Sequence, residues 1–363
     1  MVSQFETTCT PIPLMVNYIL TRFLGALATI GFLFVPLVLS TKGDRNLVLE
    51  VSTIDELWEA EELVSDPNAS SFNRIVIKLR PNVYRLSESF NIGRSRVDLV
   101  GQPGVTFVLA DSVNMPVIAV GSQDFYLTEE DLIEDISISG IEIDGNRNGQ
   151  SSEFVESKPW IRNNGIDIRA VTDMTVDSVV ANNNRSGGLV ISWKSSDIEV
   201  TNSLFENNFF DGVAYYDCIR VYTINCSMND NQFAGISLDN SVKESSFEDC
   251  SINRNGAVGI FARHSFDVSF KNCFVANSND WAVFLAHDEK DLGVHNITFN
   301  RCYLKENRGG LFMASTSEEQ SSRIYVVDSK FEGNEISGRL NIQTSGSRIY
   351  TALPEIAQFS EEN

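Results

Sequence analysis

Seven hexapeptides in this chain of 363 residues are versions of one pattern: GIDIRA (165–170), GLVISW (188–193), GVAYYD (212–217), GISLDN (235–240), GIFARH (259–264), AVFLAH (282–287) and GLFMAS (310–315). Their first residues lie 23, 24, 23, 24, 23 and 28 positions apart. A second apolar run and an Asn-rich turn follow the hexapeptides. Short apolar runs with period two, separated by Gly and Asn, are typical of strands. Units of this length cannot bury their own apolar faces, so we expect them to stack into a solenoid.

Two columns of equivalent residues support this stacking. The residue after each repeat start is aliphatic: Ile166, Leu189, Val213, Ile236, Ile260, Val283 and Leu311. An Asn column lies four residues before the repeat starts, with Ser278 and Glu306 interrupting it: Asn184, Asn208, Asn231, Asn255 and Asn334. Asn tolerates left-handed turns, and stacked side-chain amides hydrogen-bond to one another. We therefore expect an amide ladder along the solenoid.

A third column, in the second strand of each unit, holds small side chains: Ser178, Ser203, Cys226, Cys250, Cys273, Cys302 and Ser329. Four of the six cysteines of the chain fall in it. A disulfide framework spaces its cysteines differently, so we expect these four to be free thiols packed inside the coil.

This repeat pattern resembles that of the right-handed parallel β-helix proteins of the pectate-lyase-like superfamily, over about residues 48–345. The resemblance implies an all-β fold, a single-stranded right-handed parallel β-helix with regular coils from residue 165. STIDELWEAEELV (52–64) has the pattern of an amphipathic helix with Ser52 or Thr53 as N-cap. We expect this helix, over about 53–65, to cap the N-terminal end of the core. Residues 346–363 are expected to form a C-terminal tail.

The segment around IDGNRNG (143–149) is distantly similar to alginate C5-epimerases and polygalacturonases. The catalytic motifs of these families do not carry over. The strand that corresponds to the Asp-Pro-His motif of the epimerases reads GLVISWKSS (188–196), without Asp or His. Of the polygalacturonase motifs, only Asp217 stands in an equivalent place. Any activity would therefore use a different set of residues.

The only long apolar stretch is residues 14–39, which predicts a signal peptide or membrane anchor over residues 1–41. We therefore expect export to the periplasm, to the cell exterior or to the outer side of a membrane.

The formal charge is −21, and it all lies in residues 45–363 because the four charges before them cancel. Such an acidic surface repels phosphate backbones, which argues against nucleic acid as a partner. With three His and no Cys/His cluster, a structural zinc site is not predicted. We expect a monomer that binds a polysaccharide.

Candidate site residues come from the alternation within each hexapeptide. If the first and third residues after the Gly point inward, the second and fourth point outward, and the fifth lies at the strand end. The outward positions of the middle repeats mix acids, bases and aromatic residues, whereas a merely solvated face is polar without such a mixture. The predicted catalytic residues are Tyr216, Asp217, Asp239, Arg263, His264 and His287. The predicted substrate-binding residues are Arg169, Trp193, Phe261 and Phe284.

The leading hypothesis is β-elimination or C5-epimerisation of an acidic polysaccharide. Both reactions remove the proton next to a uronate carboxylate, so the site must stabilise carbanion-like charge. Arg263 would neutralise the carboxylate, with a Ca²⁺ ion held by Asp217 and Asp239 as a further option. His264 would be the base, and Tyr216 or His287 would supply the proton on the other side.

Two other functions remain open from the sequence. Asp217 and Asp239 on adjacent coils would suit a glycoside hydrolase, which needs two carboxyl groups about 5–10 Å apart. A polysaccharide-binding or structural solenoid of the cell surface needs no catalytic residues at all. The charge of −21 favours an anionic substrate only if cations bridge the two.

Overall fold

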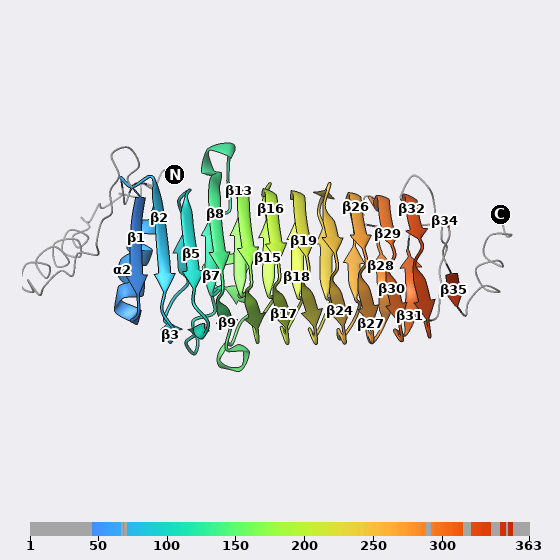
Figure 1. Cartoon of the computed structure of the whole chain (residues 1–363), viewed down its shortest axis with the longest axis horizontal. Coiled ribbons are helices and arrows are strands. Elements are labelled where there is room, and N and C mark those ends of the chain that lie inside the picture. The colour runs from blue at the N-terminus through green and yellow to red at the C-terminus, as the bar shows by residue number, and fades with distance from the viewer. Residues whose placement is uncertain are drawn as a thin grey trace, which may run out of the picture. The chain divides into compact units, whose positions relative to one another are not determined.

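The computed structural model describes residues 46–66, 68, 71–287, 292–314 and 321–334, together with the backbone of 342–345 and 348–350. The predicted leader, residues 1–41, lies outside the described residues, as does most of the predicted tail. The described chain winds into a solenoid of three parallel sheets, named A, B and C (Figure 1). No helix in this part of the chain is long and apolar enough to cross a membrane.

Sheet A contains 13 strands within the described residues. They are β1 (Asn46–Val51), β2 (Arg74–Leu79), β5 (Val97–Gly101), β8 (Ile133–Ser139), β13 (Val171–Asp177), β16 (Ser196–Thr201), β19 (Ile219–Ile224), β22 (Val242–Lys243), β23 (Ser246–Glu248), β26 (Ser265–Lys271), β29 (Val294–Asn300), β32 (Ser322–Val327) and β34 (Ile342–Ser345). The second apolar runs of the repeats form these strands. In one coil the run divides into β22 and β23.

Sheet B contains 11 strands of the described chain. They are β3 (Asn82–Leu86), β6 (Val105–Leu109), β9 (Glu142–Asp144), β14 (Val180–Asn182), β17 (Leu204–Glu206), β20 (Ser227–Asn229), β24 (Ser251–Asn253), β27 (Phe274–Ala276), β30 (Tyr303–Lys305), β33 (Lys330–Glu332) and β35 (Arg348–Tyr350). Most of them are three residues long, because a turn at the Ser/Cys column precedes each strand and a turn at the Asn column follows it.

Sheet C contains 9 strands among the described residues, and the hexapeptides form most of them. They are β4 (Phe90–Ile92), β7 (Ile118–Gly121), β12 (Ile166–Arg169), β15 (Leu189–Ser192), β18 (Val213–Tyr216), β21 (Ile236–Asp239), β25 (Ile260–Ala262), β28 (Trp281–Leu285) and β31 (Gly309–Met313). The register pairs each residue of the aliphatic column with its equivalent one coil away, as Ile166 with Leu189. The first and third positions are fully buried, which confirms the predicted inward phase.

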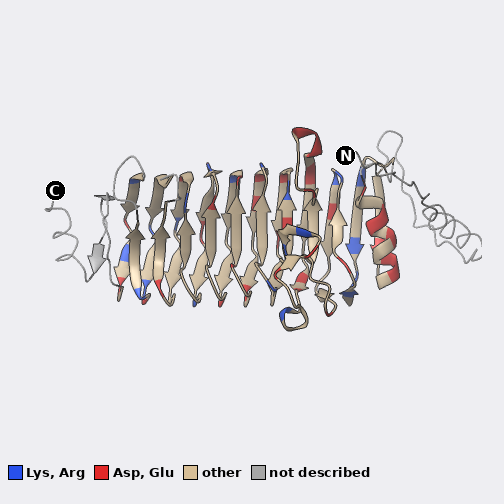
Figure 2. Ribbon diagram, turned by 180° about the vertical axis from the view of Figure 1, so that it is seen from behind, with Lys and Arg blue, Asp and Glu red and all other residues tan. Residues whose placement is uncertain are grey.

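The predicted capping helix is α2 (Ile54–Val64), and Thr53 is its N-cap. The Thr53 Oγ1 atom accepts from the Glu56 backbone N–H at 3.2 Å, and the Glu56 carboxylate accepts from the Thr53 N–H at 3.1 Å. Leu57 is completely buried against the first coils, so α2 covers one end of the core. Figure 2 shows the opposite side of α2 lined with acidic residues, which face solvent.

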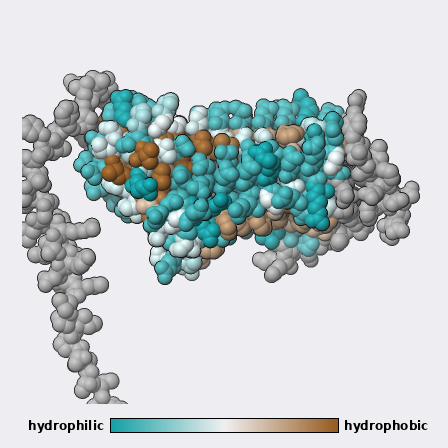
Figure 3. All heavy atoms as spheres, turned by 90° about the horizontal axis from the view of Figure 1, so that it is seen from below, coloured by the Kyte–Doolittle hydropathy of each residue, from teal (hydrophilic) through white to brown (hydrophobic). Residues whose placement is uncertain are grey.

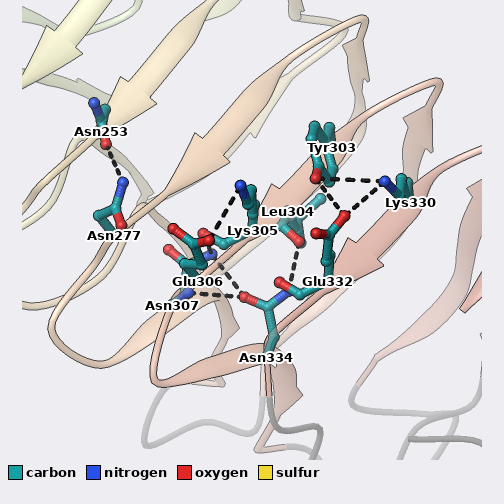
Figure 4. Close-up of polar contacts among 10 residues, drawn as sticks. All are labelled: Asn253, Asn277, Tyr303, Leu304, Lys305, Glu306, Asn307, Lys330, Glu332 and Asn334. Atoms are coloured by element: carbon teal, nitrogen blue, oxygen red, sulfur yellow. Dashed lines mark hydrogen bonds and ion pairs between the residues drawn. The ribbon is translucent and has the colours of Figure 1, made fainter. Parts of the chain in front are cut away.

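The predicted amide ladder is present and buried. Each Asn donates through Nδ2 to the Oδ1 of the next, at 2.7 Å from Asn184 to Asn208, 2.9 Å from Asn208 to Asn231, and 3.1 Å from Asn231 to Asn255. At the other end Asn307, not Glu306, occupies the ladder and donates to Asn334 at 2.9 Å (Figure 4). The turn before β31 is one residue shorter than the turns of the other coils. Asn307 therefore lies three residues before Gly310, and counting back four positions selects Glu306 instead.

The cysteine column also lies where the sequence predicts. Cys226, Cys250, Cys273 and Cys302 are buried free thiols. Each thiol contacts a backbone carbonyl two residues earlier, as Cys250 Sγ does with the Glu248 oxygen at 3.3 Å. Inside the same coils an aromatic stack runs through Tyr215 and three Phe side chains, with ring centroids 4.9–5.6 Å apart: Phe247, Phe270 and Phe299.

The outside of the solenoid is mostly polar. The face in Figure 3 is largely hydrophilic, with a hydrophobic patch over the N-terminal coils. Ion pairs link neighbouring coils, as between Arg220 and Asp197 at 2.6 Å and between Arg254 and Asp230 at 2.6 Å. Exposed pairs of this kind contribute at most about 1 kcal/mol each to stability, so the buried columns dominate.

Candidate functional site

The row of residues at which the strands of sheet C end is here called the exit edge: Ala170, Trp193, Asp217, Asn240, His264 and His287. The first five have left-handed backbones, with φ of 55°, 58°, 46°, 55° and 44°. A bulky residue such as Trp or His adopts this conformation only when surrounding bonds hold it there. Here the Asp217 and Asn240 carbonyls accept from the backbone N–H groups of Lys194 and Asp217 in the preceding coil, at 2.6 and 2.9 Å. The corner into sheet A is therefore rigid.

Tyr216, Asp239 and Arg263 form one column on three adjacent coils, as predicted. Tyr216 pairs in register with Asp239. The Arg263 guanidinium donates to both carboxylate oxygens of Asp239, through Nε at 3.0 Å and through Nη2 at 2.5 Å. Burial raises the pKa of Tyr216 to about 12, so its phenol is protonated at neutral pH and can donate a proton but not accept one. A ligand carboxylate would have to displace Asp239 to bind Arg263 in the same way.

The two predicted histidines lie on adjacent coils at the exit edge. The His264 ring packs edge-on against Phe266 of β26, with ring centroids 5.3 Å apart. Phe266 in turn stacks on His295 of β29 at 5.6 Å. His264 is thus partly exposed at the corner between sheets C and A, and its ring is in contact with sheet A. His287 is partly exposed and is the last residue described before a gap.

Asp217, also on the exit edge, is half-buried between two lysines. Partial burial raises its pKa, whereas Lys194 and Lys243 oppose this shift. These cations and the pairing of Asp239 with Arg263 do not suit a calcium site between the two carboxylates. Among the described residues, no group of three or more His, Cys, Asp or Glu is arranged to hold a metal ion.

The hairpin of β10 (Phe154–Val155) and β11 (Lys158–Arg162) is a feature that the sequence did not predict. At one end, the Trp160 indole N–H donates to the Gln123 carbonyl at 3.1 Å, and Lys158 pairs with Asp124 at 3.3 Å. At the other end, the chain leads directly into β12. The strand β11 therefore crosses the outer face of sheet C over β7 and β12. Figure 2 shows a segment of the chain that lies in front of the stacked strands, towards the end of the solenoid that carries α2.

Some outward side chains of sheet C are buried. Ala119 of β7 is 1% exposed, and Asp167 and Arg169 of β12 are 3% and 7% exposed. Desolvation raises the pKa of Asp167 to about 6, opposed by Arg169 and by the Asn164 and Gln123 side chains. The second positions of the next three strands are also buried: Val190, Ala214 and Ser237. An outward position in the repeat therefore does not by itself mean an exposed side chain.

Two of the predicted binding residues, Trp193 and Arg169, meet in a pocket of about 380 Å³, here called the aromatic pocket. The residues that line it come from two excursions and the first regular coils: Phe125, Tyr126, Leu127, Trp160, Arg169 and Trp193. Phe125 lies 4.7 Å from Tyr126 and 5.0 Å from Trp160 between ring centroids. Arg169 donates to the Ser122 and Asp124 carbonyls at 3.3 and 3.0 Å, which leaves other N–H groups of the guanidinium for a ligand.

The other two predicted binding residues, Phe261 and Phe284, lie further along the outer face of sheet C. Their rings stack at 6.1 Å between centroids, and Phe312 continues the row 5.0 Å from Phe284. Trp281 packs on Phe312 at 5.0 Å. All four side chains are partly exposed. The structure thus places the four predicted binding residues in two separate groups.

A second buried carboxyl that sequence reasoning missed is Asp211, just before β18. Its Oδ1 accepts from the Ala234 N–H one coil away at 3.0 Å. Asn164 has the same role, since its Oδ1 accepts from the Gly187 N–H at 2.9 Å. Desolvation raises the pKa of Asp211 to about 7. The hydrogen bond from Ala234, the charge of Arg162 and the side chain of Ser237 lower it, but by less. The sequence signal that could have identified both residues is a polar side chain directly before the Gly that starts a repeat.

Comparison with known proteins supports the fold. Residues 190–352 match the family model described as "Right handed beta helix region". Among solved structures, ORF18 of Geobacillus virus E2 has a TM-score of 0.63 at 13% identity, covering 82% of this chain and 61% of that protein. The surface protein and adhesin PfbA of Streptococcus pneumoniae has a TM-score of 0.55 at 12% identity, covering 82% and 93%. Polygalacturonase from Erwinia carotovora subsp. carotovora has a TM-score of 0.53 at 11% identity, covering 86% and 98%.

This chain thus spans about 61% of the length of the viral protein. No curated protein matches its sequence. At identities of 11–13% these similarities show a shared fold, and they leave the activity to be argued from the residues. The repeats and the three parallel sheets show that the described chain is a parallel β-helix, and residues 190–352 match the model of the right-handed β-helix region.

Proposed function

We propose that this protein is exported and binds an acidic polysaccharide across the exit edge and outer face of sheet C. The aromatic pocket is the observation that carries the proposal. Rings of Trp193, Trp160 and Phe125 offer flat apolar surface to the C–H faces of sugar rings, and Arg169 offers charged N–H donors. Pockets for small polar ligands typically combine aromatic walls with a few polar groups in this way.

The charge along the exit edge supports an anionic ligand. Arg169, Lys194, Lys243 and Arg263 follow one another along the edge or beside it, although the chain as a whole carries −21. The Lys194 ammonium lies 5.7 Å from the centre of the Trp193 ring, beside the pocket. Asp217 and Asp239 balance part of this positive charge, so a uronate carboxylate that binds here would meet a less acidic surface than the chain as a whole presents.

The binding proposal can be tested by isothermal titration calorimetry with oligogalacturonate, oligoalginate and a neutral xylan oligosaccharide. We expect a uronate oligosaccharide to bind, and Trp193→Ala to weaken binding about 10-fold or more through loss of the stacking surface. Tyr222→Ala is the matched control, because Tyr222 is a partly exposed aromatic residue on sheet A. Equal affinity of Trp193→Ala and wild type, or binding of the neutral sugar alone, would contradict the proposal.

A second candidate function is β-elimination or C5-epimerisation of the bound uronan, favoured by the Tyr216, Asp239 and Arg263 column beside His264. His264 would remove the C5 proton while Arg263 neutralises the uronate carboxylate in exchange for Asp239. In elimination the C4–O bond to the neighbouring sugar breaks, a C4–C5 double bond forms, and Tyr216 or His287 protonates the leaving oxygen. In epimerisation Tyr216 or His287 returns a proton to the opposite face of C5.

Catalysis is tested by incubating the protein with pectate and alginate and recording unsaturated-uronate absorbance, reducing ends and the proton NMR spectrum. We expect His264→Ala to lower turnover by about 10²–10⁴-fold. His295→Ala is the matched control, since His295 stacks on the same Phe266 from sheet A. New reducing ends without absorbance would instead indicate hydrolysis by Asp217 and Asp239, and full activity of His264→Ala would exclude His264 as the base.

A further inference from the structure

We propose that the aromatic pocket holds one end of the polysaccharide chain, so that the protein recognises chain termini rather than internal segments. This inference rests on the proposed function and adds the mode of binding. It follows from the position of the pocket, which lies where the accessible part of sheet C stops.

The β10–β11 hairpin bounds the aromatic pocket on its N-terminal side. Its Trp160 indole N–H donates to the Gln123 carbonyl, and its Lys158 pairs with Asp124. At the end of β11, the Arg162 guanidinium lies 4.7 Å from the centre of the Phe210 ring. Contacts with the rest of the solenoid therefore hold the hairpin at both ends.

The exposure of equivalent side chains marks where this boundary lies. The fourth position of β12 is Arg169, which is buried, whereas the fourth positions of β15, β18 and β21 are partly exposed: Ser192, Tyr216 and Asp239. At the fourth position, the surface available to a ligand therefore begins at β15, whereas the second positions remain buried as far as β21, at Val190, Ala214 and Ser237. A sugar chain that lies along the stacked coils meets the hairpin when it reaches Trp193.

The pocket at that boundary fits a terminal residue. Its volume of about 380 Å³ lies within the range of about 300–1,000 Å³ that small-molecule sites occupy. Trp160 from the hairpin and Trp193 from the exit edge line this open pocket together with Phe125 and Tyr126, so several aromatic rings offer stacking surface to one sugar. Arg169 lies at the buried side and would meet a carboxylate or hydroxyl group of the last sugar.

The experiment compares three forms of one uronate oligosaccharide, chosen from the calorimetric screen above: unmodified, blocked at the reducing end, and blocked at the non-reducing end. We expect one blocked form, and only one, to bind at least 10-fold more weakly. A several-fold longer oligosaccharide should still bind one protein per chain, because each chain has one such end. Equal affinity for all three forms, or several proteins bound per long chain, would overturn the inference.

Variants separate this inference from the binding proposal. Trp160→Ala removes a pocket wall and should abolish the discrimination between the blocked forms. Tyr222→Ala is again the matched control, because Tyr222 is a partly exposed aromatic residue on sheet A that does not line the pocket. If wild type binds and Trp193→Ala weakens binding while end blocking has no effect, the binding proposal stands and end recognition falls. If no uronate oligosaccharide binds, the binding proposal itself fails.

Discussion

Replacing Asp211 by Asn is expected to stabilise the solenoid at neutral and alkaline pH. Asp211 is completely covered by its surroundings and has a pKa raised to about 7, whereas an unfolded Asp titrates near 3.9. The native state therefore binds more protons than the unfolded state between about pH 4 and 7. Since stability falls with pH wherever the native state holds the extra protons, this carboxyl destabilises the fold increasingly as pH rises through that window.

The expected magnitude follows from the pKa difference of roughly three units, each worth 1.36 kcal/mol. Ionising Asp211 in the folded state thus costs up to about 4 kcal/mol above pH 7, and part of that cost is already present at pH 5. The free energy of unfolding of Asp211→Asn, relative to wild type, should grow by about 2–3 kcal/mol between pH 5 and pH 8. An amide oxygen can keep the hydrogen bond to Ala234, as Asn164 does with Gly187.

Urea unfolding followed by tryptophan fluorescence at several pH values between 5 and 8 measures this difference. Asp230→Asn is the control, because Asp230 pairs with Arg254 at the surface and lacks the desolvation of Asp211. Its stability relative to wild type should change little over the same range. A flat difference for Asp211→Asn, or a variant that becomes less stable than wild type towards pH 8, would refute the reasoning.

Three further changes test the columns and the cap by chemical denaturation. Asn231→Ala should cost about 2–4 kcal/mol, because the backbone and side-chain N–H groups of Asn208 both lose their buried acceptor, and a cost below about 1 kcal/mol would contradict a continuous ladder. Cys250→Ser should cost less than about 1 kcal/mol, since Ser203 already donates to a carbonyl from the same column at 2.7 Å, and wild-type thiols should react with Ellman's reagent only after unfolding. Thr53→Ala should cost about 1 kcal/mol through loss of the N-cap, and an unchanged midpoint would show that the capping box is not formed in solution.

The columns of the solenoid could be predicted from the sequence because each coil must bury the same face in the same register. Ile166 and Leu189 are 23 residues apart and pair directly, and the amide ladder and cysteine column follow from the same spacing. The one error, Glu306 in place of Asn307, arose at a turn of different length. A turn can lose a residue without changing the strands on either side, so a fixed count from the Gly cannot detect it.

The candidate site was predictable only in part. Alternation identified Trp193, Arg169 and the Tyr216, Asp239 and Arg263 column as outward or edge positions, and the structure agrees. Alternation does not specify which charged groups pair, and the two hydrogen bonds of Arg263 to Asp239 depend on side-chain conformations that a repeat pattern does not determine. It also does not predict that Arg169, an outward position, is buried and donates to the Ser122 and Asp124 carbonyls.

The parallel β-helix and its inward columns are predictable from the sequence, because every coil repeats the same periodic pattern. The capping helix is predictable from its amphipathic pattern and its capping box. The position of the β10–β11 hairpin and the assembly of the aromatic pocket depend instead on tertiary contacts. Phe125, Tyr126 and Trp160 belong to segments without a repeat. Their positions depend on a few long-range contacts, such as the bond from Trp160 to Gln123, which no local pattern encodes.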